Sequence, residues 1–99
     1  MSKKLHDVLT TLQSHKETLQ KFGVRQLSLF GSFARGENTD TSDLDFIVDF
    51  EKVSFDSYMD LKFYLENLLG TPVDLVLTRT LKERLRSIIL KEAIRVPGL

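Results

Sequence analysis

Hydrophobic residues recur at helical spacing in three parts of the chain, of which the first covers residues 3–22. Apolar side chains recur there every three or four residues, which places them on one face of a helix. They are Leu5, Val8, Leu9, Leu12, Leu19 and Phe22. Lys16 interrupts this face, and Gly23 follows as a typical C-terminal stop. The pattern predicts an amphipathic N-terminal helix.

The second helical pattern covers residues 55–69. Ser54 stands where an N-cap is expected, and Gly70 and Pro72 follow as residues that end a helix. The apolar stripe of this segment consists of Tyr58, Leu61, Leu65, Leu68 and Leu69.

The third helical pattern covers residues 81–94. Thr80 and Glu83 have the T-x-x-E spacing of a capping box, which favours a helix start at this point. The apolar face of the segment consists of Leu85, Ile88 and Ile89.

Three shorter segments, 26–30, 43–50 and 73–78, have the pattern of β-strands. In the second of them Leu44, Phe46, Val48 and Phe50 share one face, and Asp43, Asp45, Ile47 and Asp49 share the other. One further helical turn is expected from Ser32, so helices and strands alternate along the chain. This order predicts an α/β (α+β) fold with helices packed against one sheet. The polar loop at residues 37–42 is compatible with several geometries, including a mixed sheet.

The composition is that of an ordinary globular protein. The chain has 99 residues, the size of one domain, so we expect a single domain over residues 1–99. Cysteine is absent, which excludes disulfides, thiolate metal sites and a cysteine nucleophile. No apolar run is long enough to cross a membrane, and the first residues do not resemble a secretory signal. We therefore expect a soluble cytoplasmic protein.

The charges balance over the whole chain, with 14 Lys+Arg and 14 Asp+Glu, but they are unevenly distributed. Residues 1–36 carry a net +4, residues 37–74 a net −8 and residues 75–99 a net +4. Overall neutrality argues against a general nucleic-acid binder, because such proteins gain affinity by neutralising phosphates. The acidic middle contains alternating aspartates in an apolar segment, which a solvated surface explains poorly.

Asp43 and Asp45 lie two residues apart in a predicted strand, so their side chains point to one face with Cα atoms about 6.5 Å apart. Asp74 lies between Val73 and Leu75 and should also project from the sheet, on the side opposite these apolar residues. If the two strands are neighbours, three carboxylates converge. Such a set can hold two Mg²⁺ ions, because this cation prefers oxygen ligands.

Residues 31–36, with the sequence GSFARG, directly follow a predicted strand. Gly31 lets the backbone approach a ligand closely, and free N–H groups at a helix start bind anions. Ser32 adds a hydroxyl donor, and Arg35 adds a charge-assisted contact to phosphate. An anion site beside a metal site suits a nucleoside triphosphate bound as its Mg²⁺ complex.

Each of these elements has an ordinary explanation when it stands alone. A Gly-Ser pair is usually a turn, an Asp-x-Asp pair a solvated strand edge, Arg35 a surface residue, and Asp74 a cap or a partner of a lysine. The joint pattern of Gly-Ser after a strand, Asp-x-Asp ten residues later and a central Asp in a third strand is far more specific. Asp49 is expected to have a solvated or structural role, and His6 and His15 lack the spacing of metal ligands. No P-loop or dinucleotide-binding motif is present.

Residues 31–36 and residues 42–48, with the sequence SDLDFIV, together resemble the signature of the DNA polymerase beta-like nucleotidyltransferase superfamily. More narrowly, they resemble the minimal nucleotidyltransferase (MNT) proteins of bacteria and archaea. The resemblance covers nearly the whole chain, and Asp74 matches the third carboxylate of the family. It implies the superfamily's small mixed β-sheet with flanking helices.

The resemblance also implies roles for individual residues. Asp43, Asp45 and Asp74 would be the catalytic carboxylates and would bind two Mg²⁺ ions. Asp74 would bind the catalytic ion and help to activate the attacking hydroxyl. ATP would be the co-substrate. The nucleotide-binding residues would be Gly31, Ser32, Arg35 and Ser42.

MNT proteins are typically paired with a HEPN-domain ribonuclease toxin. The MNT antitoxin silences this toxin by transferring AMP from ATP to one of its tyrosines. The resemblance therefore implies a HEPN-domain toxin as the partner, in a hetero-oligomer. Larger relatives have an extra domain that holds their substrate, and its absence here favours a substrate supplied by another protein.

Two other functions stay open. A catalytically idle antitoxin could neutralise its partner by binding and occlusion. Its docking residues would be Phe33, Phe55, Tyr64 or the tail at 94–99. A DNA-binding autoregulator could use the basic side chains Lys82, Arg84, Arg86 and Lys91. These charges are explained more simply as the solvated outer face of a helix and as suited to its C-terminal end.

Overall fold

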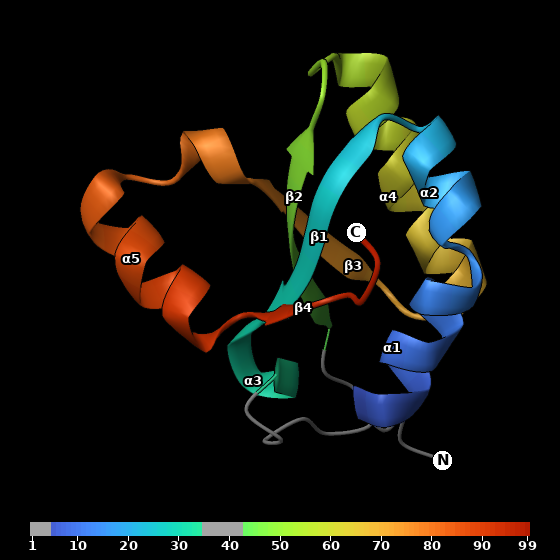
Figure 1. The fold of residues 1–99 in the computed structure, drawn as a ribbon, viewed down its shortest axis with the longest axis horizontal. Helices are drawn as coiled ribbons and strands as arrows, with labels where there is room; N and C mark the ends of the chain where they lie inside the picture. Colours follow the sequence, from blue (N-terminus) through green and yellow to red (C-terminus); the bar gives the residue numbers. More distant parts are fainter. Residues whose placement is uncertain (1–4, 35–42) are drawn as a thin grey trace.

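The structure is a computed structural model that describes residues 5–34 and 43–99 (Figure 1). The elements in chain order are α1 (Leu5–Ser14), α2 (Lys16–Lys21), β1 (Val24–Phe30), α3 (Gly31–Ala34), β2 (Leu44–Phe50), α4 (Phe55–Leu69), β3 (Val73–Leu77), the 3-10 turn η1 (Thr78–Thr80), α5 (Glu83–Glu92) and β4 (Ile94–Arg95). The strands form one sheet in the order β3-β2-β1-β4. β1 is antiparallel to β2 and β4, whereas β2 and β3 are parallel. The predicted α/β (α+β) fold with a small mixed sheet and flanking helices is therefore confirmed.

The predicted N-terminal helix is divided into α1 and α2 at His15, one residue before the interruption seen in the sequence. The backbone of His15 has φ −109° and ψ 17°, and its Nδ1 atom lies 2.8 Å from the carbonyl oxygen of Thr11. Gly23 adopts φ +90° directly before β1, which an L-residue adopts only with strain. The chain can therefore turn from α2 straight into the sheet.

Both ends of α4 are set by the residues that the sequence indicates. The Ser54 side chain accepts a hydrogen bond of 3.1 Å from the backbone N–H of Ser57. Gly70 ends the helix with φ +67°, and its N–H donates to the carbonyl oxygen of Glu66. Leu61, Leu65 and Leu69 from the predicted stripe are buried.

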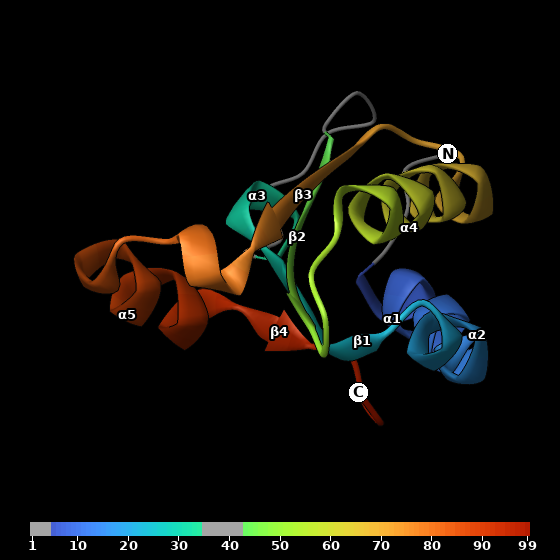
Figure 2. The same ribbon diagram turned by 90° about the horizontal axis from the view of Figure 1, so that it is seen from above.

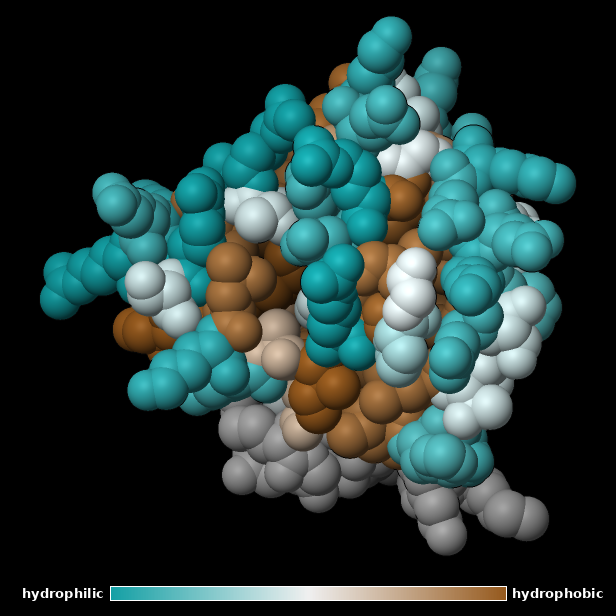
Figure 3. Space-filling view, in the orientation of Figure 1, coloured by the Kyte–Doolittle hydropathy of each residue, from teal (hydrophilic) through white to brown (hydrophobic). Residues whose placement is uncertain are grey.

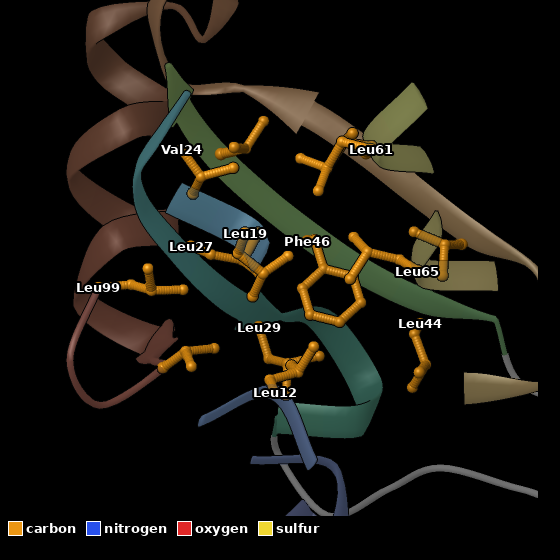
Figure 4. Close-up of a cluster of buried hydrophobic side chains, with 14 of the residues drawn as sticks. Leu12, Leu19, Val24, Leu27, Leu29, Leu44, Phe46, Leu61, Leu65 and Leu99 are labelled. Atoms are coloured by element: carbon orange, nitrogen blue, oxygen red, sulfur yellow. The ribbon is translucent and has the colours of Figure 1, made fainter. Parts of the chain in front are cut away.

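Helices α1, α2 and α4 cover one face of the sheet, and α3 and α5 lie on the other side (Figure 2). The hydrophobic core fills the space under α1, α2 and α4 (Figure 4). β2 contributes Leu44, Phe46, Val48 and Phe50 to this core. Its alternate residues Asp45, Ile47 and Asp49 point to the opposite face, where Ile47 is also buried. The sheet thus has one face for the core and one face that carries carboxylates.

The predicted capping box of α5 is wrong. Residues 78–80 form a 3-10 turn, in which the Thr80 hydroxyl donates to the carbonyl oxygen of Leu77 instead of capping a helix. The helix begins at Glu83, and no side-chain hydrogen bond caps its start. Its apolar face is not part of the core, since Leu85 and Ile88 are 49% and 55% exposed.

The strand β4 was not predicted. Ile94 pairs with Leu29 of β1, and the N–H of Val96 donates to the carbonyl oxygen of Leu27. Val96 and Leu99 are buried in the core. The expectation that residues 94–99 are free to dock a partner is therefore wrong, because the core uses part of this tail. Within the described ranges, no helix combines the length and the apolar character that a membrane crossing requires.

Candidate functional site

Asp45 and Asp74 are direct neighbours in the parallel ladder between β2 and β3. Residues on both sides of each aspartate point into the core, so the two carboxylates project to the other face. Neighbouring strands lie about 4.8 Å apart, which brings the two side chains within reach of one ligand. Asp45 is half-buried and Asp74 is exposed. The predicted proximity of these two carboxylates is thus present.

Gly31 lies against Asp45 of this pair. Its predecessor Phe30 is the antiparallel partner of Asp45, so the end of β1 reaches the start of β2. Gly31 has φ +76°, and a Cβ atom built on it would overlap Oδ2 of Asp45. Only a residue without a side chain allows this approach. The helical turn α3 begins at Gly31, so the start of this turn lies beside the Asp45 carboxylate.

Asp43 is exposed and directly precedes β2, two residues before Asp45. Over residues 5–34 and 43–99, no three His, Cys, Asp or Glu side chains are arranged to hold a metal ion together. The structure brings Asp45 and Asp74 together as neighbours in the ladder, but it does not place Asp43 in a three-carboxylate cluster with them. Joint metal binding by all three stays a prediction. The side chain of Ser32, and all of Arg35 and Ser42, lie outside the described residues.

The donor chemistry of the pair fits a hard divalent cation. Both side chains offer carboxylate oxygens, the ligands that Mg²⁺ prefers. Two adjacent negative charges repel each other, and a cation between them removes that repulsion. Asp45 and Asp74 would hold such an ion on the open face of the sheet, next to the Gly31 backbone.

Asp49 also lies on this face of β2, but further along the strand. Its Oδ2 atom is 3.9 Å from Nε of Arg25 on β1. An exposed ion pair at this distance contributes little to stability. Its position away from Asp45 agrees with the structural or solvated role expected from the sequence.

Three side chains of α4 contact the backbone of β3 beside Asp74, although the sequence places only Tyr58 among them, as part of the apolar stripe, and predicts no role at the site for any of the three. They are Tyr58, Lys62 and Glu66. The backbone N–H of Val73 donates to Glu66 and lowers the pKa of its carboxyl, and nearby Lys62 lowers it further against the opposing effect of burial. The sequence signal for this group is its spacing of four residues, which places all three on one side of the helix.

One surface hollow of the described residues lies away from the carboxylate pair. An open hollow of about 350 Å³ is lined in part by Lys21, Gly23 and Glu51. These residues adjoin the start of β1 and the end of β2, whereas Gly31 and Asp45 lie at the other end of the same strand pair. This hollow is therefore separate from the carboxylate pair.

This chain is similar to known nucleotidyltransferases in sequence and in fold. A family model of the nucleotidyltransferase domain matches residues 12–96. The protein adenylyltransferase MntA of Thermococcus cleftensis is 42% identical over 94 residues, which cover 93% of this chain and 95% of that protein. A solved structure of a minimal nucleotidyltransferase is also 42% identical, with a TM-score of 0.73 over 87% of this chain and 93% of that one.

Structures of toxin–antitoxin complexes share the fold at lower identity. A chain from a complex with AMP-PNP has a TM-score of 0.69 at 22% identity, covering 88% of this chain and 73% of that one. A chain from a complex of an MNT antitoxin with the tri-AMPylated HEPN toxin of Shewanella oneidensis has a TM-score of 0.65 at 19% identity, covering 93% and 73%. At these identities the likeness shows a common fold.

Proposed function

This chain belongs to the nucleotidyltransferase domain family, and from that membership we propose that it transfers AMP from ATP to a hydroxyl group of a partner protein. The similarity to a protein adenylyltransferase over nearly the whole chain supports AMP as the group and a protein as the acceptor. The observation that carries the chemistry is the register that pairs Asp45 with Asp74 beside the Gly31 backbone.

In the proposed reaction, the acceptor oxygen forms a bond to the α-phosphorus of ATP, the bond to pyrophosphate breaks, and the hydroxyl proton is released. Asp43, Asp45 and Asp74 would hold two Mg²⁺ ions. When bound, Mg²⁺ would lower the pKa of the acceptor hydroxyl and neutralise charge on the triphosphate. Asp74 would help to activate the acceptor hydroxyl. The residues proposed to hold and orient the nucleotide are Gly31, Ser32, Arg35 and Ser42.

We propose a HEPN-domain toxin as the partner and one of its tyrosines as the acceptor. The shared fold with an MNT antitoxin that occurs in complex with an AMPylated HEPN toxin supports this choice. The exposure of Asp74 also suits a macromolecular acceptor, because a partner's surface can reach its carboxylate. The reaction would take place in the cytoplasm, where ATP is available.

The test uses the protein, its neighbouring-gene product, Mg²⁺ and ATP labelled at the α-phosphate. We expect label to appear on the partner with the intact protein and to be lost with the double variant Asp43→Asn, Asp45→Asn. Absence of transfer by the intact protein, or undiminished transfer by the double variant, would contradict the proposal. Mass spectrometry of the labelled partner identifies the acceptor residue.

A second candidate function is neutralisation of a partner by binding alone. The observation that favours it is the apolar face of α5, where Leu85 and Ile88 are exposed. Figure 3 shows hydrophobic surface between hydrophilic side chains in the region of α5. Phe55 is 77% exposed and could also contact a partner. The ring of Tyr64 instead packs against Phe22, at a centroid distance of 5.2 Å. Phe33 has its side chain outside the described residues.

The two functions differ in what the carboxylates must do. If occlusion suffices, the double variant Asp43→Asn, Asp45→Asn still protects cells from the partner and binds it normally. If AMP transfer is required, the same variant binds the partner but fails to protect. Cell survival and a pull-down of the pair measure the two outcomes.

A further inference from the structure

β3 is an edge strand of the sheet, so one row of its backbone polar groups has no strand to pair with. Alternate residues of an extended strand direct their N–H and C=O groups to the same edge. The N–H of Leu44 in β2 donates to the carbonyl oxygen of Pro72, which places residues 72 and 74 on the inner side. Val73 and Leu75 therefore direct their polar groups outward.

Side chains from one row of α4 bind these outward groups. The hydroxyl of Tyr58 donates to the carbonyl oxygen of Leu75 at 2.6 Å. Lys62 Nζ donates to the carbonyl oxygen of Val73 at 2.8 Å, and Oε2 of Glu66 accepts from the N–H of Val73 at 3.0 Å. Nζ of Lys62 also donates to Oε2 of Glu66 at 3.3 Å. These three side chains take the place of a neighbouring strand.

The fit between helix and strand follows from their rises. Residues four apart in a helix lie about 6 Å apart along its axis. Residues two apart in a strand lie about 6.6 Å apart. The row on α4 can therefore reach both Val73 and Leu75, while Asp74 between them keeps its own backbone directed toward β2.

We propose that Tyr58, Lys62 and Glu66 are positioning residues that hold the backbone on both sides of Asp74 and thereby fix its carboxylate beside Asp45. The catalytic side of this inference rests on the proposed AMP transfer. The physical reason is that an edge strand has only one neighbouring strand to restrain it. A displacement of about 1 Å at a reacting group can reduce a rate by about 100-fold.

The variant Tyr58→Phe tests the inference, because it removes one hydroxyl that binds the outer edge of β3 at the Leu75 carbonyl. We expect kcat for AMP transfer to fall about 3- to 10-fold, with KM for ATP unchanged. The expected loss is smaller than about 100-fold, because the variant removes only one of the hydrogen bonds from α4 to β3. Tyr64→Phe is the matched control on the same helix, because the Tyr64 ring packs against Phe22 instead of β3. It should leave kcat unchanged.

A double-mutant cycle separates positioning from general stability. If Tyr58 acts through Asp74, Tyr58→Phe has no further effect on transfer in an Asp74→Asn background. An equal loss of rate in both backgrounds, or no loss in either, overturns the inference.

A second measurement needs no turnover. Binding of Mn²⁺ in the presence of AMP-PNP, followed by electron paramagnetic resonance, should weaken about 3- to 10-fold in Tyr58→Phe and remain unchanged in Tyr64→Phe, as the carboxylate pair loosens. Equal Mn²⁺ affinity in Tyr58→Phe and the native protein overturns the inference. If the native protein transfers no AMP, the proposed function fails, and the Mn²⁺ measurement alone decides whether α4 positions Asp74.

Discussion

The carboxylate of Asp45 occupies the space into which a side chain on residue 31 would have to project. Gly31 directly follows β1 and Asp45 lies near the start of β2, so two separate segments of the sequence meet at one point. The contact explains in steric terms why a glycine precedes Ser32. It also means that the backbone of Gly31 lies directly against the carboxylate of Asp45.

Gly31→Ala should therefore damage both stability and activity. A Cβ atom adds the strain of a left-handed backbone, about 1–2 kcal/mol, and in addition displaces Asp45. We expect AMP transfer to fall at least about 10-fold. Gly23→Ala is the control, because Gly23 also has positive φ but has open space around its Cβ position. Thermal unfolding and label transfer measure both effects, and equal loss of activity in the two variants would contradict the steric explanation.

Asp74→Asn should reduce AMP transfer by at least about 100-fold, because a neutral amide cannot replace the negative charge of the pair. Asp49→Asn, on the same face of β2 but paired with Arg25, should retain most of the activity. Removal of divalent cations with EDTA should abolish transfer in the native protein. A similar loss in the Asp49 and Asp74 variants would mean that the face as a whole, and not the pair, carries the activity.

Leu65→Ala should destabilise the protein by about 2–5 kcal/mol, because Leu65 is fully buried between α4 and the sheet. Phe63→Ala, two residues away on the same helix and 53% exposed, should change the free energy of unfolding by no more than about 0.5 kcal/mol. Urea denaturation compares the two variants. A larger loss of stability in Phe63→Ala than in Leu65→Ala would contradict the assignment of Leu65 to the core.

Glu66 predicts a pH-dependent contribution to stability. Its pKa is lowered in the folded protein, mainly by the hydrogen bond from the Val73 N–H. The ionised carboxylate therefore stabilises the fold fully above the unfolded pKa of about 4.3, and this contribution is lost as the pH falls through the lower folded pKa. The difference in stability between native protein and Glu66→Gln should shrink as the pH is lowered below about 4.3. A difference that grows on acidification would contradict this sign.

Much of the fold could be predicted from local patterns. Ser54 and Gly70 mark the ends of α4 because capping depends on neighbouring residues alone. The alternation in residues 44–50 predicts β2 and its two faces for the same reason. By contrast, β4 is a two-residue strand with no repeating pattern, and it exists because β1 offers it an edge.

The site could be predicted only in part. Asp45 and Asp74 stand out as carboxylates in apolar strands, but their pairing depends on the parallel register of β2 and β3, which no local pattern specifies. The apolar face of α5 is visible in the sequence. Periodicity alone does not show whether such a face is buried, and in the structure Ile88 is exposed. Thr80 has the spacing of a capping box with Glu83, but its hydroxyl donates to the carbonyl oxygen of Leu77 instead.

The two faces of β2 separate mutations that affect folding from mutations that affect chemistry. A mutational scan of residues 44–50 that measures cellular abundance and activity in parallel should therefore alternate with a period of two. Abundance should fall at Leu44, Phe46, Val48 and Phe50. At Asp45 it should hold while activity is lost. Ile47 should break the alternation, because it faces the site side yet is only 2% exposed.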